Sequence, residues 1–162
     1  MLVIVDSREK PQAIRNILAY FDRHGIAYEK RALKTGDYTL EGHGDVVVDR
    51  KQSLQELAHN LLSPDRARFY REIRRAQESG IRLIILCEQA GIKTFADVKN
   101  WKPKFGKVSG KALMDAIFRL EVGYHVPVLF CDKRSTGRQI IEILTGEGYE
   151  ERPDAGDRPD QG

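Results

Sequence analysis

Three charged residues, Asp37, Asp49 and Lys51, stand where the sequence predicts the ends of two neighbouring strands. Asp37 begins the first predicted strand, Asp49 and Lys51 end the second, and the turn Gly42–Gly44 separates them. Antiparallel pairing across this turn would bring the start of the first strand beside the end of the second. Residues 49 and 51 share one face because side chains alternate along a strand. The spacing therefore predicts two carboxylates and an ammonium in one small patch.

Such a patch is suited to metal-assisted hydrolysis of a phosphodiester. Two carboxylates can hold Mg²⁺ while phosphate oxygens and water complete its shell. The metal polarises the phosphate and lowers the pKa of bound water, and Lys51 can position that water or stabilise developing negative charge. The backbone carbonyl of Arg50 is a candidate further ligand. The alternative is a surface ion pair worth about 0–1 kcal/mol, but the fixed partner Asp37 favours the hydrolytic interpretation.

The elements that must position these residues follow from apolar runs and periodicity. Three consecutive strands between two helices predict an α/β protein of three layers, with helices flanking a central mixed sheet. A Rossmann unit would place a helix after each strand and needs a glycine fingerprint that is absent. Helices are predicted at 11–24, 53–62 (with a Ser53–Glu56 capping box), 66–79, 94–100, 109–122 and 136–145, and strands at 2–5, 26–33, 36–42, 44–51, 82–88 and 127–131.

At this point the chain resembles a known family. GDY at 36–38 and VVVDRK at 46–51 resemble the GD…ERK signature of the ERCC4/XPF-type nucleases, within the PD-(D/E)xK nuclease superfamily. VDSRE at 5–9 and LIILCE at 83–88 resemble the opening strand of that family and its hydrophobic strand ending in Glu. The resemblance implies a restriction-endonuclease-like αβββαβ core over a domain of residues 1–146. It also implies a Mg²⁺- or Mn²⁺-dependent endonuclease acting on branched, flap or fork DNA in DNA repair or recombination.

Carried over by position, the resemblance implies roles for individual residues. Glu9 would be a third carboxylate at the metal, although an acid ahead of Pro11 also favours a helix start through the helix dipole. The implied catalytic set is Asp37, Asp49, Lys51, Arg50 and Glu9, the implied metal ligands are Asp37, Asp49 and Glu9, and Asp6, Arg8 and Glu88 are polar residues expected near the site.

The chain departs from the family pattern at three points. Asp49 stands where the family usually has Glu, and Gln55 replaces the acid four residues beyond the signature lysine. Glu56 is explained as the capping partner of Ser53 and is not counted as catalytic. Nothing in the sequence resembles the helicase domain or the tandem helix-hairpin-helix module, which in the family grips DNA and helps dimerisation. Substrate choice and oligomeric state therefore stay open.

Basic residues outside the patch predict contacts with a polyanion. On the helix 66–79, the arginines either neutralise phosphates or form a solvated face. In the segment 101–111, lysines alternate with Trp101 and Phe105, which suits base stacking on single strands, although Trp101 could equally cover the core edge. The segment is not a Walker A loop, so no nucleotide cofactor is expected. The predicted DNA-binding residues are Arg8, Arg66, Arg71, Lys104, Lys107 and Lys111.

Composition and charge agree with a nucleic-acid partner. The 162 residues carry a net charge of +3, and residues 147–162 contain six acids and two arginines, so the first 146 residues carry +7. A basic body favours a polyanionic partner, and the acidic tail 147–162 is expected to be disordered. No apolar run approaches the roughly 20 residues that a bilayer crossing needs, and the N-terminus resembles no signal peptide. We expect an intracellular protein without a membrane partner.

Two further expectations concern cysteines and assembly. Cys87 and Cys131 lie in apolar runs and are expected to be buried free thiols rather than a disulfide framework. By analogy with the family we expect a homodimer. Its candidate surface comprises Leu113, Ile117, Leu120, Ile140, Ile141 and Leu144 on the last two helices, although these side chains could equally be core.

The alternatives to a DNA endonuclease are a non-catalytic module that binds nucleic acid or a partner, and an enzyme that cleaves RNA.

Overall fold

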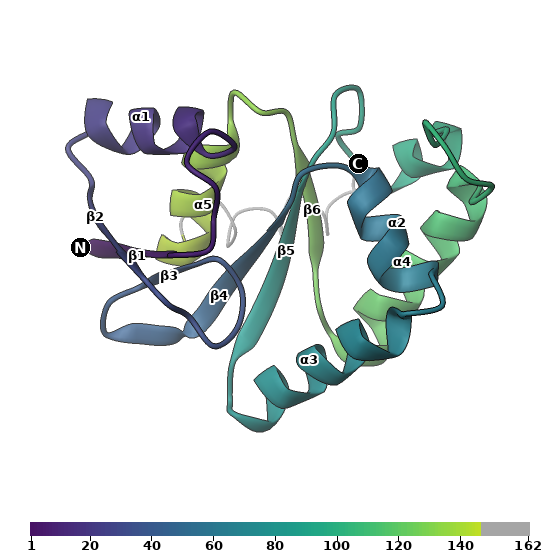
Figure 1. Ribbon diagram of the computed structural model, residues 1–162, viewed down its shortest axis with the longest axis horizontal. Coiled ribbons are helices and arrows are strands. Elements are labelled where there is room, and N and C mark those ends of the chain that lie inside the picture. The colour runs from purple at the N-terminus through teal and green to yellow at the C-terminus, as the bar shows by residue number, and fades with distance from the viewer. Residues whose placement is uncertain (147–162) are drawn as a thin grey trace, which may run out of the picture.

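The computed structural model describes residues 1–146, and the predicted disordered tail lies outside the described residues. Six strands form one mixed sheet with the order β2-β1-β3-β4-β5-β6 (Figure 1). Strand β3 pairs antiparallel with both β1 and β4, and the other neighbouring pairs are parallel. The strands are β1 (Leu2–Asp6), β2 (Ala27–Arg31), β3 (Tyr38–Leu40), β4 (His43–Lys51), β5 (Arg82–Glu88) and β6 (Val128–Cys131).

Helices cover both faces of the sheet, which confirms the predicted three-layer α/β architecture. Helices α1 and α5 pack together on one face, and the remaining helices lie on the other face (Figure 1). The helices are α1 (Arg15–Arg23), α2 (Leu54–Leu62), α3 (Arg66–Glu78), the 3-10 helix η1 (Phe95–Asn100), α4 (Gly110–Tyr124) and α5 (Thr136–Thr145). Within residues 1–146, none of these helices is long and apolar enough to cross a bilayer.

Strand β4 lies in the middle of the sheet and is fixed by a hydrophobic core on each face. Val47 is buried in the core beneath α2, α3 and α4, whereas Val48 is buried in the core beneath α1 and α5. Successive side chains of a strand point to opposite faces, so Asp49 and Lys51 lie on the face of Val47, and Arg50 lies on the face of Val48. Burial on both sides therefore determines where the charged end of the strand points.

Two predicted helix starts differ in detail from the structure. Helix α1 begins at Arg15, because residues 11–14 form turns rather than a first helical turn after Pro11. Ser53 caps α2 as predicted, with its Oγ accepting from the Glu56 backbone N–H at 3.1 Å. The Glu56 carboxylate accepts instead from the backbone N–H of Gln52, at 2.8 Å, so the reciprocal half of the capping box is displaced by one residue.

The apolar residues predicted as a dimer surface are core residues. Leu113, Ile117, Leu120 and Ile140 are fully buried, Leu144 is buried, and Ile141 packs against the core beneath α1 and α5. Their helical spacing reflects packing against the sheet rather than an exposed face. That expectation of an interface was therefore wrong in its residues, and the homodimer stays a prediction without an assigned surface.

Candidate functional site

Asp37 is held at the junction of three strands. Its backbone N–H donates to the Val48 carbonyl at 2.8 Å, and its own carbonyl accepts from the Asp6 N–H at 2.7 Å. Its side-chain Oδ2 accepts from the backbone N–H of Arg50 at 2.7 Å. The antiparallel pairing predicted from the glycine turn therefore places Asp37 beside the end of β4, and backbone hydrogen bonds fix its carboxylate.

The glycine of the GD pair is required by sterics. Gly36 has a φ of +71°, which L-residues rarely adopt. A Cβ at this position would lie 2.2 Å from Cγ1 of Val47 and 3.2 Å from the Val48 carbonyl oxygen. Glycine therefore lets the chain turn close against β4 immediately before Asp37, and this close approach brings the carboxylate to the strand.

Lys51 forms the buried cation of the site. Its Nζ lies 3.3 Å from Oδ2 of Asp49 and 4.9 Å from the ring centroid of Phe69 on α3, and the residue is only 7% exposed. Burial by itself lowers the pKa of the ammonium, but the neighbouring carboxylates, Asp49 first, outweigh it, so the pKa of Lys51 is raised. Lys51 therefore remains charged beside Asp49, and the Phe69 ring face adds a cation–π contact.

The carboxyl groups of Asp37 and Asp49 lie close enough that the charge of one disfavours ionisation of the other. Burial first, then the negative charge of Asp49 and that of Glu9, raise the pKa of the Asp37 carboxyl to about 9. A divalent cation between the two carboxylates would relieve this repulsion, and Mg²⁺ in proteins is often held by one or two carboxylates plus substrate phosphates. Within residues 1–146, no group of three or more His, Cys, Asp or Glu side chains is arranged to hold a metal. Asp37 and Asp49 are the side chains that would hold such a cation, with water and phosphate as its other ligands.

Arg50 joins two further carboxylates on the opposite face of the sheet. Its guanidinium donates through Nε and one terminal nitrogen to the two oxygens of Glu9, at 2.8 and 3.0 Å, and through the other terminal nitrogen to Glu88, at 3.0 Å. Tyr38 donates its hydroxyl to Glu9 at 2.7 Å, and Thr136 donates to Glu88 at 2.7 Å. We call these five residues the Arg50 network.

Glu9 belongs to this network rather than to the patch of Asp37 and Asp49. Both of its oxygens are bonded by Arg50, and Tyr38 adds a third hydrogen bond. Burial lowers the pKa of the Arg50 guanidinium, but the hydrogen bonds and charge of Glu9 raise this pKa by more than burial lowers it. The net shift is therefore upward. The roles of Arg50 as a catalytic residue and of Glu9 as a metal ligand stay predictions. In the structure, the two side chains form an ion pair with each other on the opposite face of β4.

Asp6 and Arg8 brace the loop that leads to Asp37. The buried Asp6 accepts from Arg8 Nε at 2.9 Å and from the Leu33 backbone N–H at 2.9 Å, and Arg8 also donates to the Leu33 carbonyl at 2.6 Å. The side chain of Arg8 is nevertheless 69% exposed.

Arg66 and Arg71 both lie exposed on α3, and Arg66 donates to the Ser63 carbonyl at 3.1 Å. Their predicted phosphate contacts remain predictions.

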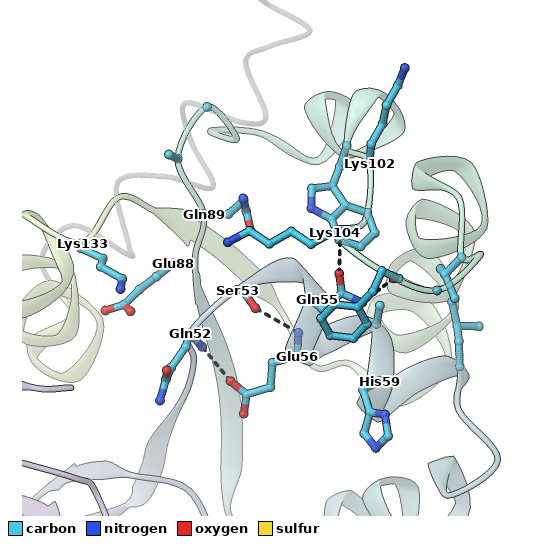
Figure 2. A pocket seen from close by; sticks show the side chains of 18 of the residues that line it. Gln52, Ser53, Gln55, Glu56, His59, Glu88, Gln89, Lys102, Lys104 and Lys133 are labelled. Atoms are coloured by element: carbon cyan, nitrogen blue, oxygen red, sulfur yellow. Dashed lines mark hydrogen bonds between the residues drawn. The ribbon is translucent and has the colours of Figure 1, made fainter. Parts of the chain in front are cut away.

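A groove of about 1240 Å³ opens over the start of α2, and Gln52, the residue after Lys51, lies in its lining (Figure 2). Lys104 lines it, whereas Lys107 and Lys111 are exposed residues outside its lining. Trp101 is 9% exposed and packs into the core, so it covers the core edge, while Phe105 is 70% exposed.

The other cations of this groove were not among the predicted DNA-binding residues; they are Lys102, Lys133 and Arg134. A signal for two of them exists, because Lys133 and Arg134 follow the apolar run that becomes β6. Strands β4, β5 and β6 are parallel, so their carboxyl ends meet at one edge of the sheet. The residues after β6 therefore lie at the same edge as Lys51 and Glu88.

The mixed six-stranded sheet and its carboxylate–lysine patch on β4 define an α/β domain of nuclease fold. The sequence matches the ERCC4 domain family over residues 5–144. A solved structure, XPF from Aeropyrum pernix, has 21% sequence identity and a TM-score of 0.66, over 99% of this chain and 70% of that chain. No curated protein sequence matches the chain. The match over most of the chain shows that it belongs to the ERCC4 domain family, and the solved structure independently supports the fold.

Proposed function

We propose that this protein is a divalent-metal-dependent endonuclease that hydrolyses phosphodiester bonds in branched, flap or fork DNA. The observation that carries the proposal is the convergence of Asp37, Asp49 and Lys51 on one face at the end of β4. Membership of the ERCC4 domain family supports the reaction class and a role in DNA repair or recombination. The basic body of the chain supports a nucleic-acid substrate.

Each residue of the patch has a task that follows from its surroundings. Asp37 and Asp49 would hold Mg²⁺ or Mn²⁺, because their mutual repulsion makes a cation between them favourable. The bound metal would supply a polarised phosphate and a more acidic water. Lys51 stays protonated beside Asp49, so it can stabilise negative charge on the phosphate without giving up a proton.

The decisive experiment compares two isosteric substitutions on the same strand. Asp49→Asn removes a charge of the patch, whereas Asp45→Asn removes an exposed charge from the beginning of β4. With Mg²⁺ and a panel of single-stranded, duplex, flap and four-way DNA, Asp49→Asn should lose cleavage and Asp45→Asn should retain it. Equal cleavage by Asp49→Asn and the unchanged protein would refute the assignment, and cleavage that survives a chelator would refute the metal dependence.

A second candidate function is a non-catalytic module that binds nucleic acid or a partner. It is favoured by the absence of a third metal-ligating side chain near the patch among residues 1–146, and by Gln55 at the position of a family acid. Isothermal calorimetry with Mn²⁺ separates the two functions, because an enzyme of the proposed type binds the ion and Asp49→Asn abolishes this binding. Cleavage of RNA in place of DNA is tested by adding RNA versions of the same substrates.

A further inference from the structure

The groove beside the patch has the chemistry of a polymer-binding site. Its walls come from α2, the loop after β5, the segment 101–108 and the loop between β6 and α5. Its volume of about 1240 Å³ exceeds the roughly 300–1,000 Å³ of ordinary small-molecule pockets. Figure 2 shows Lys102 and Lys104 on one side of the groove and Lys133 on the other.

The groove is lined by more cationic than anionic side chains. Among residues 1–146, no ion pair is formed by its four cations, which are Lys102, Lys104, Lys133 and Arg134. Its three carboxylates all accept hydrogen bonds from the protein. Glu56 accepts from Gln52, Glu88 accepts from Arg50 and Thr136, and Asp132 accepts from the backbone at the start of α5. The cations therefore remain available to an anionic ligand.

An aromatic ring is held over the groove by a specific side chain. Phe105 is 70% exposed, and its loop is bound by Gln55, which accepts from the Lys104 backbone N–H at 3.1 Å and donates to the Phe105 carbonyl at 3.3 Å. A primary amide can do both at once, because its oxygen accepts and its nitrogen donates. A carboxylate at position 55 could accept from Lys104 but would repel the Phe105 carbonyl. Gln55 therefore fixes the backbone that carries the exposed ring.

The lining of the groove begins one residue after the candidate active site. Gln52 follows Lys51 directly and lines both this groove and a second hollow beside Lys10 and Pro11. The negative charge of Glu56, in the groove wall, acts on Lys51. A strand lying in the groove would therefore pass Gln52, the residue that follows Lys51.

We propose that this groove binds a short stretch of single-stranded DNA, with one base stacked on Phe105 and phosphates bound by Lys104 and Lys133. Exposed aromatic rings beside cations are how proteins bind single strands without sequence preference. In a duplex, by contrast, the base faces are already covered. This inference rests on the proposed function, because it assigns the groove to the unpaired arm of a branched substrate.

Trp101 makes the proposal testable without any cleavage. It is the only tryptophan of the chain and it lines the groove, so its fluorescence reports on occupancy. Titration with oligo-dT in the presence of a chelator should change this fluorescence to saturation. Phe105→Ala should weaken the affinity about ten-fold, since a base–aromatic stack supports a change of that order. Phe118→Ala, at an exposed phenylalanine on α4 outside the groove, is the matched control and should leave the affinity unchanged.

Two further variants test the groove cations and the hydrogen bonds by which Gln55 holds the loop of Phe105. The double variant Lys104→Gln with Lys133→Gln should reduce the slope of log affinity against log salt by about 1.4, which is the value for two phosphate contacts on a single strand. Lys30→Gln on β2, away from the groove, should leave the slope unchanged. Gln55→Glu should weaken binding of oligo-dT while the urea midpoint of unfolding stays the same, because only the loop is released.

The outcomes separate this inference from the proposed function. Binding that depends on Phe105, in a protein that cleaves no DNA with Mg²⁺, would support the groove and refute the endonuclease. Cleavage with unchanged oligo-dT affinity in Phe105→Ala would refute the groove and leave the endonuclease standing. Equal affinity for a blunt duplex of the same length would also overturn the proposal, as would tighter binding of oligo-U than of oligo-dT.

Discussion

Replacement of Arg50 by methionine should destabilise the domain more than replacement of any of its exposed charged residues. The Arg50 side chain is 2% exposed, and it neutralises Glu9 and Glu88, whose side chains are 10% and 3% exposed. Methionine matches the length of the aliphatic stem but removes all donors. It would leave two carboxylates in a nearly dry environment without a cation.

The expected magnitude follows from the cost of breaking one buried ion pair. Removal of one partner of such a pair typically destabilises a protein by about 3–5 kcal/mol. Here one substitution removes the partner of two carboxylates, so we expect at least the middle of that range. The control is Arg8→Met, because Arg8 also binds a buried carboxylate but is itself 69% exposed, so the loss should be much smaller than for Arg50→Met.

Urea unfolding followed by Trp101 fluorescence and by circular dichroism measures both variants. The total stability of a domain this size is about 5–15 kcal/mol, so Arg50→Met should fold with a much lower midpoint. Adding Glu88→Gln to Arg50→Met should recover part of the loss, since one uncompensated charge disappears. A loss for Arg50→Met no larger than that for Arg8→Met would refute the reasoning that the Arg50 network is a buried support.

Three other predictions concern the turn, the lysine and the thiols. Gly36→Ala should destabilise the protein by more than about 2 kcal/mol, because the positive φ and the overlap with β4 act together, whereas Gly42→Ala, with a positive φ but open space, should cost about 1 kcal/mol; similar urea midpoints for the two variants would contradict this. Lys51→Met should reduce cleavage by about 10²–10³-fold and leave oligo-dT affinity in a chelator unchanged, and a parallel loss of both would make Lys51 a binding residue. Burial raises the pKa of the Cys131 thiol to about 11 and also raises the pKa of Cys87, so neither forms appreciable thiolate at neutral pH. Both thiols should resist iodoacetamide until the protein unfolds, with reactivity at Cys131 rising only as the pH approaches 11, and rapid labelling of the folded protein at pH 7.5 would show that the sheet opens there.

The sequence predicted where Asp37, Asp49 and Lys51 lie, because strand geometry leaves little freedom. Once GDVVVDRK is taken as a strand bounded by a glycine turn, the alternation of side chains places Asp49 and Lys51 together. The turn then brings Asp37 to the end of that strand, as the hydrogen bond from the Arg50 N–H shows. The long apolar runs and the capping serine likewise fixed the order of strands and helices.

The sequence could not predict features that depend on which elements meet in space. The bond between Glu88 and Thr136 joins residues 48 positions apart, and no local pattern signals it. The backbone of Lys104 and Phe105 is likewise bound by Gln55, which lies 49 and 50 residues away in the sequence. The apolar stripes of α4 and α5 suggested an interface because a helix face that packs on a sheet has the same spacing as one that packs on a partner.

Strand β4 carries charged side chains on both faces, and this changes how substitutions at position 50 should be interpreted. The backbone N–H of Arg50 holds the carboxylate of Asp37, while its side chain holds Glu9 and Glu88 on the opposite face. Loss of the side chain would therefore move the strand that positions Asp49 and Lys51, without removing any group from their patch. A loss of cleavage in an Arg50 variant is then expected from positioning alone. A direct catalytic role would require that Arg50→Lys, which keeps the charge inside the network, lose cleavage while retaining both the urea midpoint of unfolding and the binding of Mn²⁺.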